Sequence, residues 1–137
     1  MLQRLLLAST SPYRRALLER LRVPFSAVAP EVDEAPHAGE GPDMTASRLA
    51  QAKAHVIGVA HSGAIVIGSD QVAVLDGIAL GKPGTHDAAL AQLLAARGRA
   101  VVFHTAVCVL DAATGAAQVA NVPTTVYYRD YSEAQAR

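Results

Sequence analysis

The sequence has little that would suit an extracellular protein or a protein held by a charged surface. It contains one cysteine, Cys108, which has no internal disulfide partner and lies in an apolar run, so we expect a buried thiol in a reducing cytoplasm. Its 12 basic and 12 acidic side chains balance, so no net field would hold nucleic acid or an anionic membrane. It also lacks an apolar run of transmembrane length and a signal-peptide pattern. We therefore expect a cytoplasmic protein that binds neither nucleic acid nor a membrane.

The composition is that of a folded domain. The chain has 137 residues, 51% of them hydrophobic and 18% charged, which is enough for one core and too short for two. Segments typical of strands and helices alternate along it, which predicts an α/β domain with a mixed, largely parallel central sheet, flanking helices and a cleft at the strand ends. Strands are predicted at residues 5–7, 25–29, 64–68, 72–75, 78–80, 100–110 and 117–128, and helices at 14–21, 43–59 and 85–97.

The stretch from Leu5 to Arg15 predicts an anion site. A leucine run indicates a buried strand, and Ser11 followed by Pro12 predicts a helix N-cap with proline at the first helical position. The free N–H groups at such a helix start attract anions. Further donors would come from Ser9, Thr10, Ser11 and either Arg14 or Arg15. The alternative is an ordinary strand-to-helix turn with solvated arginines.

Carboxylates and lysines elsewhere complete an inventory for phosphoryl chemistry. Glu34 lies in a polar loop predicted from Pro30 to Pro42, and Asp70 follows the strand predicted at 64–68, at its end. Lys53 and Lys82 could neutralise phosphate charge, while carboxylates hold a magnesium-like ion and activate water. Each residue also has a plainer interpretation: Asp70 could cap a turn, Lys53 could face solvent, and Glu34 could be an inert loop residue.

Taken together, these stretches resemble the successive motifs of the Maf nucleotide pyrophosphatases, in the same order and at the same spacing. The matching segments are 8–15, 30–34, 48–53, 67–72 and 81–83. The resemblance implies a fold similar to that of the inosine-triphosphate pyrophosphatases. It also implies a Mg²⁺- or Mn²⁺-dependent enzyme that cuts a modified nucleoside triphosphate between the α- and β-phosphates.

The resemblance assigns roles to individual residues. Asp70 matches the water-activating acid, and Glu34 matches a carboxylate that shares the metal ion with Asp70. Catalytic roles then fall to Asp70, Glu34, Lys53 and Lys82, and phosphate-binding roles to Ser9, Ser11, Arg14 and Arg15.

Tyr13 and Gln71 are similar to the branch of the family that converts 7-methyl-GTP to 7-methyl-GMP and pyrophosphate. N7-methylguanine carries a positive charge and stacks well on an electron-rich ring, and a glutamine amide can donate to and accept from a base edge. The alternatives are that Tyr13 is a half-buried aromatic on the core face of its helix and that Gln71 is a solvated strand residue.

The chain also departs from the family. Ala106 stands where the family often has glycine, and family chains continue well beyond position 137. We therefore expect residues 1–137 to form a single Maf-like domain that lacks the family's C-terminal portion. The alternative function is a truncated, non-catalytic module that binds nucleotides or another subunit. The family resemblance also admits a homodimer.

Overall fold

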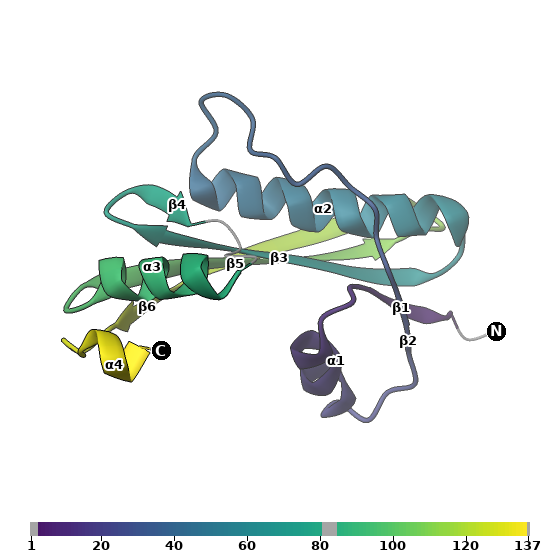
Figure 1. Cartoon of the computed structure of the whole chain (residues 1–137). Helices are drawn as coiled ribbons and strands as arrows, with labels where there is room; N and C mark the ends of the chain where they lie inside the picture. The colour runs from purple at the N-terminus through teal and green to yellow at the C-terminus, as the bar shows by residue number, and fades with distance from the viewer. Residues whose placement is uncertain (1–2, 81–84, 137) are drawn as a thin grey trace.

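The computed structural model describes residues 3–80 and 85–136, in which one twisted sheet carries all the strands (Figure 1). The helices are α1 (Pro12–Glu19), α2 (Pro42–Ala60), α3 (His86–Ala96) and α4 (Glu133–Ala136), and the strands are β1 (Leu5–Ala8), β2 (Ser26–Val28), β3 (Ile65–Leu75), β4 (Ile78–Leu80), β5 (Ala100–Asp111) and β6 (Ala117–Tyr127). The strand order is β2-β1-β3-β5-β6, and β4 pairs with β3. Within the described residues, no helix is both long and apolar enough to cross a membrane.

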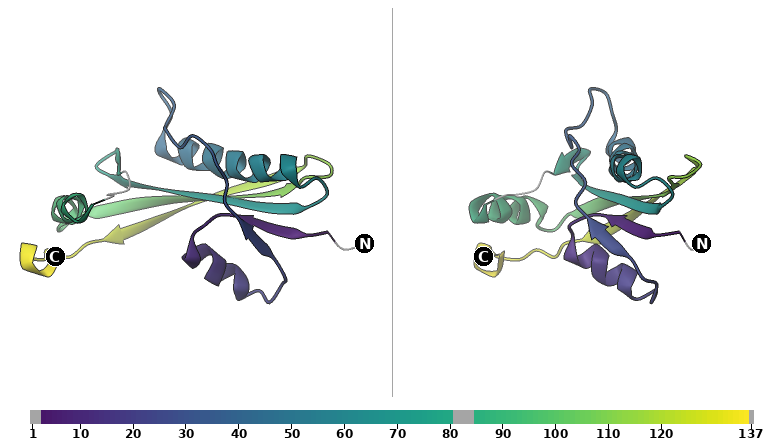
Figure 2. Two further views of the ribbon diagram at one scale, coloured as in Figure 1. Left: turned by 45° about the vertical axis from the view of Figure 1, so that its right-hand side comes forward. Right: turned by 90° about the vertical axis from the view of Figure 1, so that its right-hand side faces the viewer.

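The helices lie on different sides of this sheet. The long helix α2 covers one face, and α1 lies on the opposite side beside β1 (Figure 2). Helices α3 and α4 lie at the end of the sheet where the β3–β4 hairpin turns. The predicted α/β class, with a sheet flanked by helices, is therefore confirmed.

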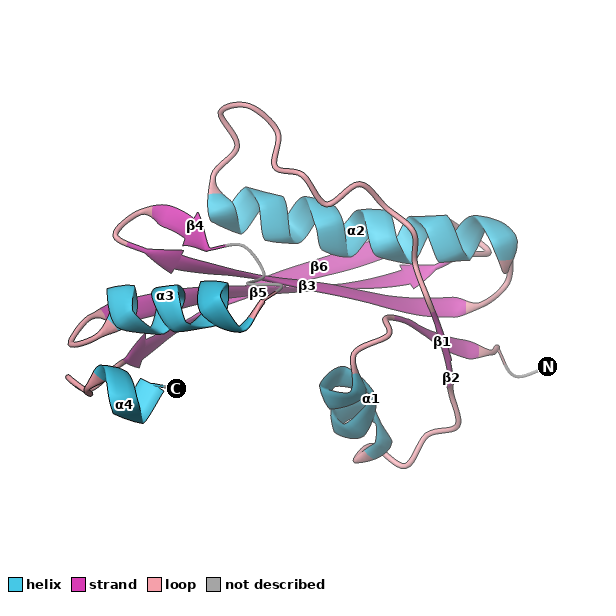
Figure 3. Ribbon diagram, viewed as in Figure 1, coloured by secondary structure: helices cyan, strands magenta, loops and turns pink. Residues whose placement is uncertain are grey.

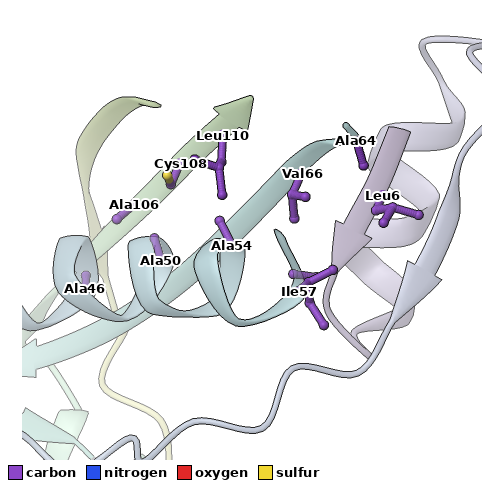
Figure 4. Close-up of a cluster of buried hydrophobic side chains, with 11 residues drawn as sticks. Leu6, Ala46, Ala50, Ala54, Ile57, Ala64, Val66, Ala106, Cys108 and Leu110 are labelled. Atoms are coloured by element: carbon purple, nitrogen blue, oxygen red, sulfur yellow. The ribbon is translucent and has the colours of Figure 1, made fainter. Parts of the chain in front are cut away.

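The core lies between α2 and the sheet and is built largely from small side chains. Ala46, Ala50 and Ala54 recur every four residues on α2, which places them on one face of the helix. This face packs on Cys108 of β5 and Val66 of β3, all of them buried (Figure 4). Burial raises the pKa of the Cys108 thiol, and its place in the core confirms the predicted buried cysteine.

Pairing in the sheet is mixed, as predicted, but with a larger antiparallel share than expected. Strand β1 runs parallel to β2 and β3, whereas β3 is antiparallel to β4 and β5, and β5 is antiparallel to β6. The expectation of a largely parallel sheet therefore overstates the parallel part. For the β3–β4 and β5–β6 pairs the reason is that short turns join the strands, and a short turn permits only antiparallel pairing.

Strand β3 is also longer than predicted, which moves Asp70 from the end of a strand to its middle. The strand continues because β5 pairs with it from Ile65 to Leu75. Its other neighbour, β1, stops at Ala8 opposite Gly68, two residues before Asp70. The predicted cleft at a strand end therefore arises at the end of β1, and Asp70 lies just past that point on the strand that continues.

The last strand of the order, β6, forms one margin of the sheet. In the described part of the chain it pairs with β5, and Pro123 stands near its middle, opposite His104. Most of its side chains are exposed. Proline lacks a backbone donor and is confined to such edge strands or to bulges, so its position here follows the usual rule.

Candidate active site

The turn between β1 and α1 forms a compact set of donors and hydroxyl groups, which we call the phosphate turn (residues 9–14). The hydroxyl of Ser11 caps α1 by accepting a hydrogen bond from the backbone N–H of Arg14, with Pro12 at the start of the helix. The predicted N-cap is therefore confirmed. The buried Ser9 hydroxyl accepts from the backbone N–H of Ser11 at 3.0 Å and from Nη1 of Arg14 at 3.4 Å. These bonds hold the turn in place at the N-terminus of the helix.

Arg14 and Arg15, which the sequence leaves as alternatives, have different surroundings. Arg14 is partly buried and lines the cavity beside the turn. Arg15 is exposed, pairs with Glu19 at 3.3 Å and lies with its guanidinium 6.0 Å from the centre of the Phe25 ring. The structure thus directs Arg14 toward the cavity and leaves Arg15 on the outer side of the helix.

Lys53 joins two acidic residues from different elements. Its Nζ atom, on α2, lies 2.8 Å from Oδ1 of Asp70 on β3 and 2.9 Å from Oε1 of Glu34. Because both oxygens contact one nitrogen, the two carboxylates lie within about two hydrogen-bond lengths of each other. Lys53 and Asp70 are buried, so the alternative of a solvent-facing lysine is wrong.

Glu34 reaches this cluster from the segment between β2 and α2, residues 29–41, which we call the acidic loop. Figure 3 shows the loop passing beside α2 and turning back at the N-terminal end of that helix. The Glu34 side chain is 47% exposed, in contrast to its buried partner Lys53. The loop therefore brings one solvent-accessible carboxylate to a buried lysine–aspartate pair.

A cavity of about 680 Å³ opens between the phosphate turn and this cluster. It is lined by Ser9, Ser11 and Arg14 of the turn, by residues 30–34 of the acidic loop and by Lys53. Hydroxyl groups, a helix N-terminus and two cations that can bind a polyphosphate chain thus face one space, together with the carboxylates of Glu31, Asp33 and Glu34. We call this space the phosphate cavity.

A second, more apolar cavity of about 620 Å³ adjoins the phosphate cavity and shares Ser11 and Arg14 with it. Tyr13 and Gln71 both line it. Tyr13 is 82% exposed, so the alternative of a half-buried aromatic on the core face of α1 is wrong. Gln71 is an exposed residue of β3, as the alternative expects, and its amide donates to Oγ1 of Thr105 at 2.9 Å.

Glu34 and Asp70 form a donor set that suits a hard divalent ion. Mg²⁺ is commonly bound by one or two carboxylates together with substrate phosphates and water. Among the described residues, no group of three His, Cys, Asp or Glu side chains is arranged to hold an ion. Glu34 and Asp70 are the carboxylates here that could hold such an ion, and one oxygen of each contacts Nζ of Lys53 in this structure.

The sequence prediction and the structure do not cover the same residues in two cases, Lys82 and Arg48. Lys82, predicted to be a catalytic lysine, lies outside the described residues. Conversely, sequence reasoning assigned no role to Arg48, whose guanidinium donates to Glu40 at 2.7 Å. Arg48 and a hydrogen bond from Thr45 together lower the pKa of Glu40 from its ordinary value of 4.5 to about 2. The sequence signal for this pair is weak, because eight residues separate its members and only Arg48 stands in a motif segment.

Comparison with known proteins agrees with this geometry. The chain belongs to the Maf-like protein family, whose profile matches residues 4–137. It is 55% identical to the "7-methyl-GTP pyrophosphatase" of Cupriavidus metallidurans over 96% of this chain and 66% of that protein. Proteins with the same description from Burkholderia lata and Paraburkholderia xenovorans are 56% and 57% identical, each over 96% of this chain and 64% and 65% of the relative. The chain thus spans about two thirds of the length of the curated relatives it matches.

Proposed function

We propose that this protein is a nucleoside triphosphate pyrophosphatase that hydrolyses 7-methyl-GTP to 7-methyl-GMP and pyrophosphate. The observation that carries the proposal is the position of Lys53, which contacts both Asp70 and Glu34 at the edge of the phosphate cavity. The description shared by relatives that are 55–57% identical supports the choice of substrate.

The two adjoining cavities suggest how the substrate would lie. The phosphates would enter the phosphate cavity, where the N-terminus of α1 and Arg14 attract their charge. The base would enter the second cavity, against Tyr13 and Gln71. A cationic base on the Tyr13 ring and hydrogen bonds to the Gln71 amide would then favour 7-methylguanine over an uncharged base.

The proposed reaction is a single displacement at the α-phosphorus. A water oxygen forms a bond to the α-phosphorus, and its proton passes to the carboxylate of Asp70. The bond between the α-phosphorus and the bridging oxygen breaks, and pyrophosphate leaves with that electron pair. Lys53 and Arg14 would stabilise the negative charge that gathers on the phosphate oxygens. A divalent ion, Mg²⁺ or Mn²⁺, held by Glu34 and Asp70 would offset the negative charge on those oxygens.

The test is to measure pyrophosphate release from 7-methyl-GTP, GTP, dTTP and UTP, each with Mg²⁺ or Mn²⁺. We expect 7-methyl-GTP to be hydrolysed fastest, with 7-methyl-GMP as the other product. Asp70→Asn should lower the rate at least about 100-fold, since general base catalysis typically contributes 10²- to 10⁴-fold. The matched control is Asp76→Asn, which changes an exposed aspartate in the β3–β4 turn.

Two results would contradict the proposal. One is a wild-type protein that releases no pyrophosphate from any of these nucleotides, and the other is an Asp70→Asn variant that retains the wild-type rate. Thermal stabilisation by 7-methyl-GTP without hydrolysis would instead favour the non-catalytic nucleotide-binding module.

The homodimer, the cytoplasmic location and the single-domain interpretation of residues 1–137 stay predictions. Light scattering during gel filtration measures the oligomeric state directly. A mass of twice 14.3 kDa is the expected result for the homodimer.

A further inference from the structure

Arg48 lies on α2, five residues before Lys53, and bonds to the acidic loop at two points. Its Nε atom donates to Oε2 of Glu40 at 2.7 Å, and its Nη2 atom donates to Oε1 of the same carboxylate at 3.2 Å. The same Nη2 atom donates to the backbone carbonyl of Ala35 at 2.9 Å. One guanidinium therefore contacts two parts of the loop that lie five residues apart.

The attachment at Glu40 is the firmer of the two. The Glu40 side chain is 8% exposed, and its Oε1 atom also accepts from Oγ1 of Thr45 at 2.7 Å and from the backbone N–H of His37 at 3.1 Å. Paired donation from a guanidinium to a carboxylate is among the stronger protein hydrogen-bond arrangements. The pKa of Glu40 is lowered to about 2, so this carboxylate stays charged over the whole neutral range.

The attachment at Ala35 bears directly on the proposed site. Ala35 follows Glu34, whose carboxylate lies 2.9 Å from Nζ of Lys53 and is 47% exposed. The bond from Arg48 to the Ala35 carbonyl fixes the backbone next to Glu34.

We propose that Arg48 is a positioning residue that holds the acidic loop against α2 and so keeps the Glu34 carboxylate beside Lys53. This inference rests on the proposed function in one respect, since Glu34 is there assigned to the divalent ion. Arg48 itself touches neither substrate nor ion in this assignment. Its effect passes through the backbone of residues 35–40.

The experiment compares Arg48→Gln and Arg48→Lys with the wild-type protein. Glutamine removes the guanidinium fork, and lysine keeps the charge beside Glu40 but loses the planar fork that also reaches Ala35. The matched control is Arg99→Gln, which breaks an exposed arginine–aspartate pair with Asp76 at the β3–β4 turn. Three quantities are measured: hydrogen exchange of residues 33–40, binding of Mn²⁺ with α,β-methylene-GTP by electron paramagnetic resonance, and kcat and KM for 7-methyl-GTP.

We expect Arg48→Gln to speed hydrogen exchange in residues 33–40 at least tenfold and to weaken Mn²⁺ binding by a similar factor. A displacement of about 1 Å in a catalytic group can cost about 100-fold in rate, so kcat should fall about 10- to 100-fold. KM should change less than about threefold, because the phosphate turn, which includes Tyr13, lies between β1 and α1 and not on the acidic loop. A general loss of stability would lower the amount of folded protein without changing the Mn²⁺ affinity of what remains. Arg48→Lys should retain most of the thermal stability and still bind Mn²⁺ less tightly than wild type.

Wild-type exchange in residues 33–40 of Arg48→Gln would overturn the inference, and so would wild-type Mn²⁺ affinity in that variant. If Arg48→Gln does not fold, Arg48→Lys is judged by the same two measurements. The failure of the proposed function is recognised separately, by the absence of pyrophosphate release from the wild-type protein. In that case the hydrogen-exchange comparison still decides whether Arg48 holds the loop.

Discussion

Gly68 of β3 and Ala50 of α2 lie so close together that a side chain on the glycine would overlap the helix backbone. A Cβ atom at position 68 would lie 2.2 Å from the carbonyl oxygen of Ala50 and 2.7 Å from the backbone nitrogen of Ala54. This approach occurs two residues before Asp70 and alongside the helical turn that carries Lys53. The absence of a side chain at Gly68 is thus what lets α2 lie near enough for Lys53 to reach Asp70 at 2.8 Å.

We therefore expect Gly68→Ala to separate α2 from β3. Overpacking a core typically costs about 1–3 kcal/mol, so the free energy of unfolding should fall by that amount. Pyrophosphate release should fall as well, because the distance from Lys53 to Asp70 grows. Thermal unfolding and the hydrolysis assay measure the two effects.

The control for this variant is Gly63→Ala. Gly63 has φ +92°, and a Cβ there would meet nothing within 4 Å, so its substitution introduces backbone strain without crowding. Gly63→Ala should cost about 1–2 kcal/mol in stability and leave the rate of the folded protein unchanged. Equal effects of the two substitutions on the hydrolysis rate would contradict the role given to Gly68.

Removing the Lys53 ammonium should destabilise the fold as well as the chemistry. Lys53→Met leaves the buried Asp70 carboxylate without its cation, and breaking a buried pair in this way costs about 3 kcal/mol or more. The melting temperature should fall by roughly 10 °C. The double variant Lys53→Met/Asp70→Asn should be more stable than Lys53→Met, since the unpaired buried charge is gone. A double variant less stable than Lys53→Met would contradict this account.

Tyr13→Ala should lower the preference for the methylated base. A cation–π contact at an exposed ring is worth about 1 kcal/mol, so kcat/KM for 7-methyl-GTP relative to GTP should fall about fivefold. Tyr13→Phe should retain most of the preference. Tyr127→Ala is the matched control, because Tyr127 on β6 is as exposed as Tyr13 and lines neither cavity of the candidate site. An unchanged substrate ratio in Tyr13→Ala would show that the ring does not contact the base.

The Glu40–Arg48 pair predicts a particular acid dependence. The pKa of Glu40 is about 2 in the folded protein and 4.5 ordinarily, so its ionised form favours folding above pH 4.5. That contribution is lost progressively as the pH falls from 4.5 toward 2. The stability difference between wild type and Glu40→Gln should therefore be largest near neutral pH and shrink below pH 4.5. Thermal melts between pH 7 and pH 2.5 measure it, and a pH-independent difference would contradict the assignment.

The parts of the site that the sequence predicted correctly are those set by neighbouring residues. The Ser11 cap, the Pro12 start and the strand before them depend on interactions within a few residues, and the structure confirms all three. The hairpin predicted at 72–75 and 78–80 is likewise a local feature, with both turn residues at positive φ. Local backbone preferences are strong enough to decide such features without tertiary contacts.

The sequence failed where tertiary contacts decide. The apolar run that ends at Gly68 appeared to end a strand, whereas pairing with β5 carries β3 seven residues further, to Leu75. A lysine on a helix is ordinarily solvated, and Lys53 is buried because α2 packs closely over Gly68. Arg48 stands in a recognised motif segment, but its contact with Ala35 depends on how a 13-residue loop folds back. The spacing of residues along the sequence does not indicate any of these three outcomes.

The position of Pro123 near the middle of β6 has a consequence for how this protein behaves at high concentration. Among the described strands β6 pairs with β5 alone, and an edge strand of eleven residues is a template on which other chains can add, the first step toward aggregates. A proline has no backbone donor and therefore interrupts the ladder that an incoming strand would form. Replacing Pro123 with valine should therefore leave the fold intact and lower the concentration at which the protein begins to precipitate.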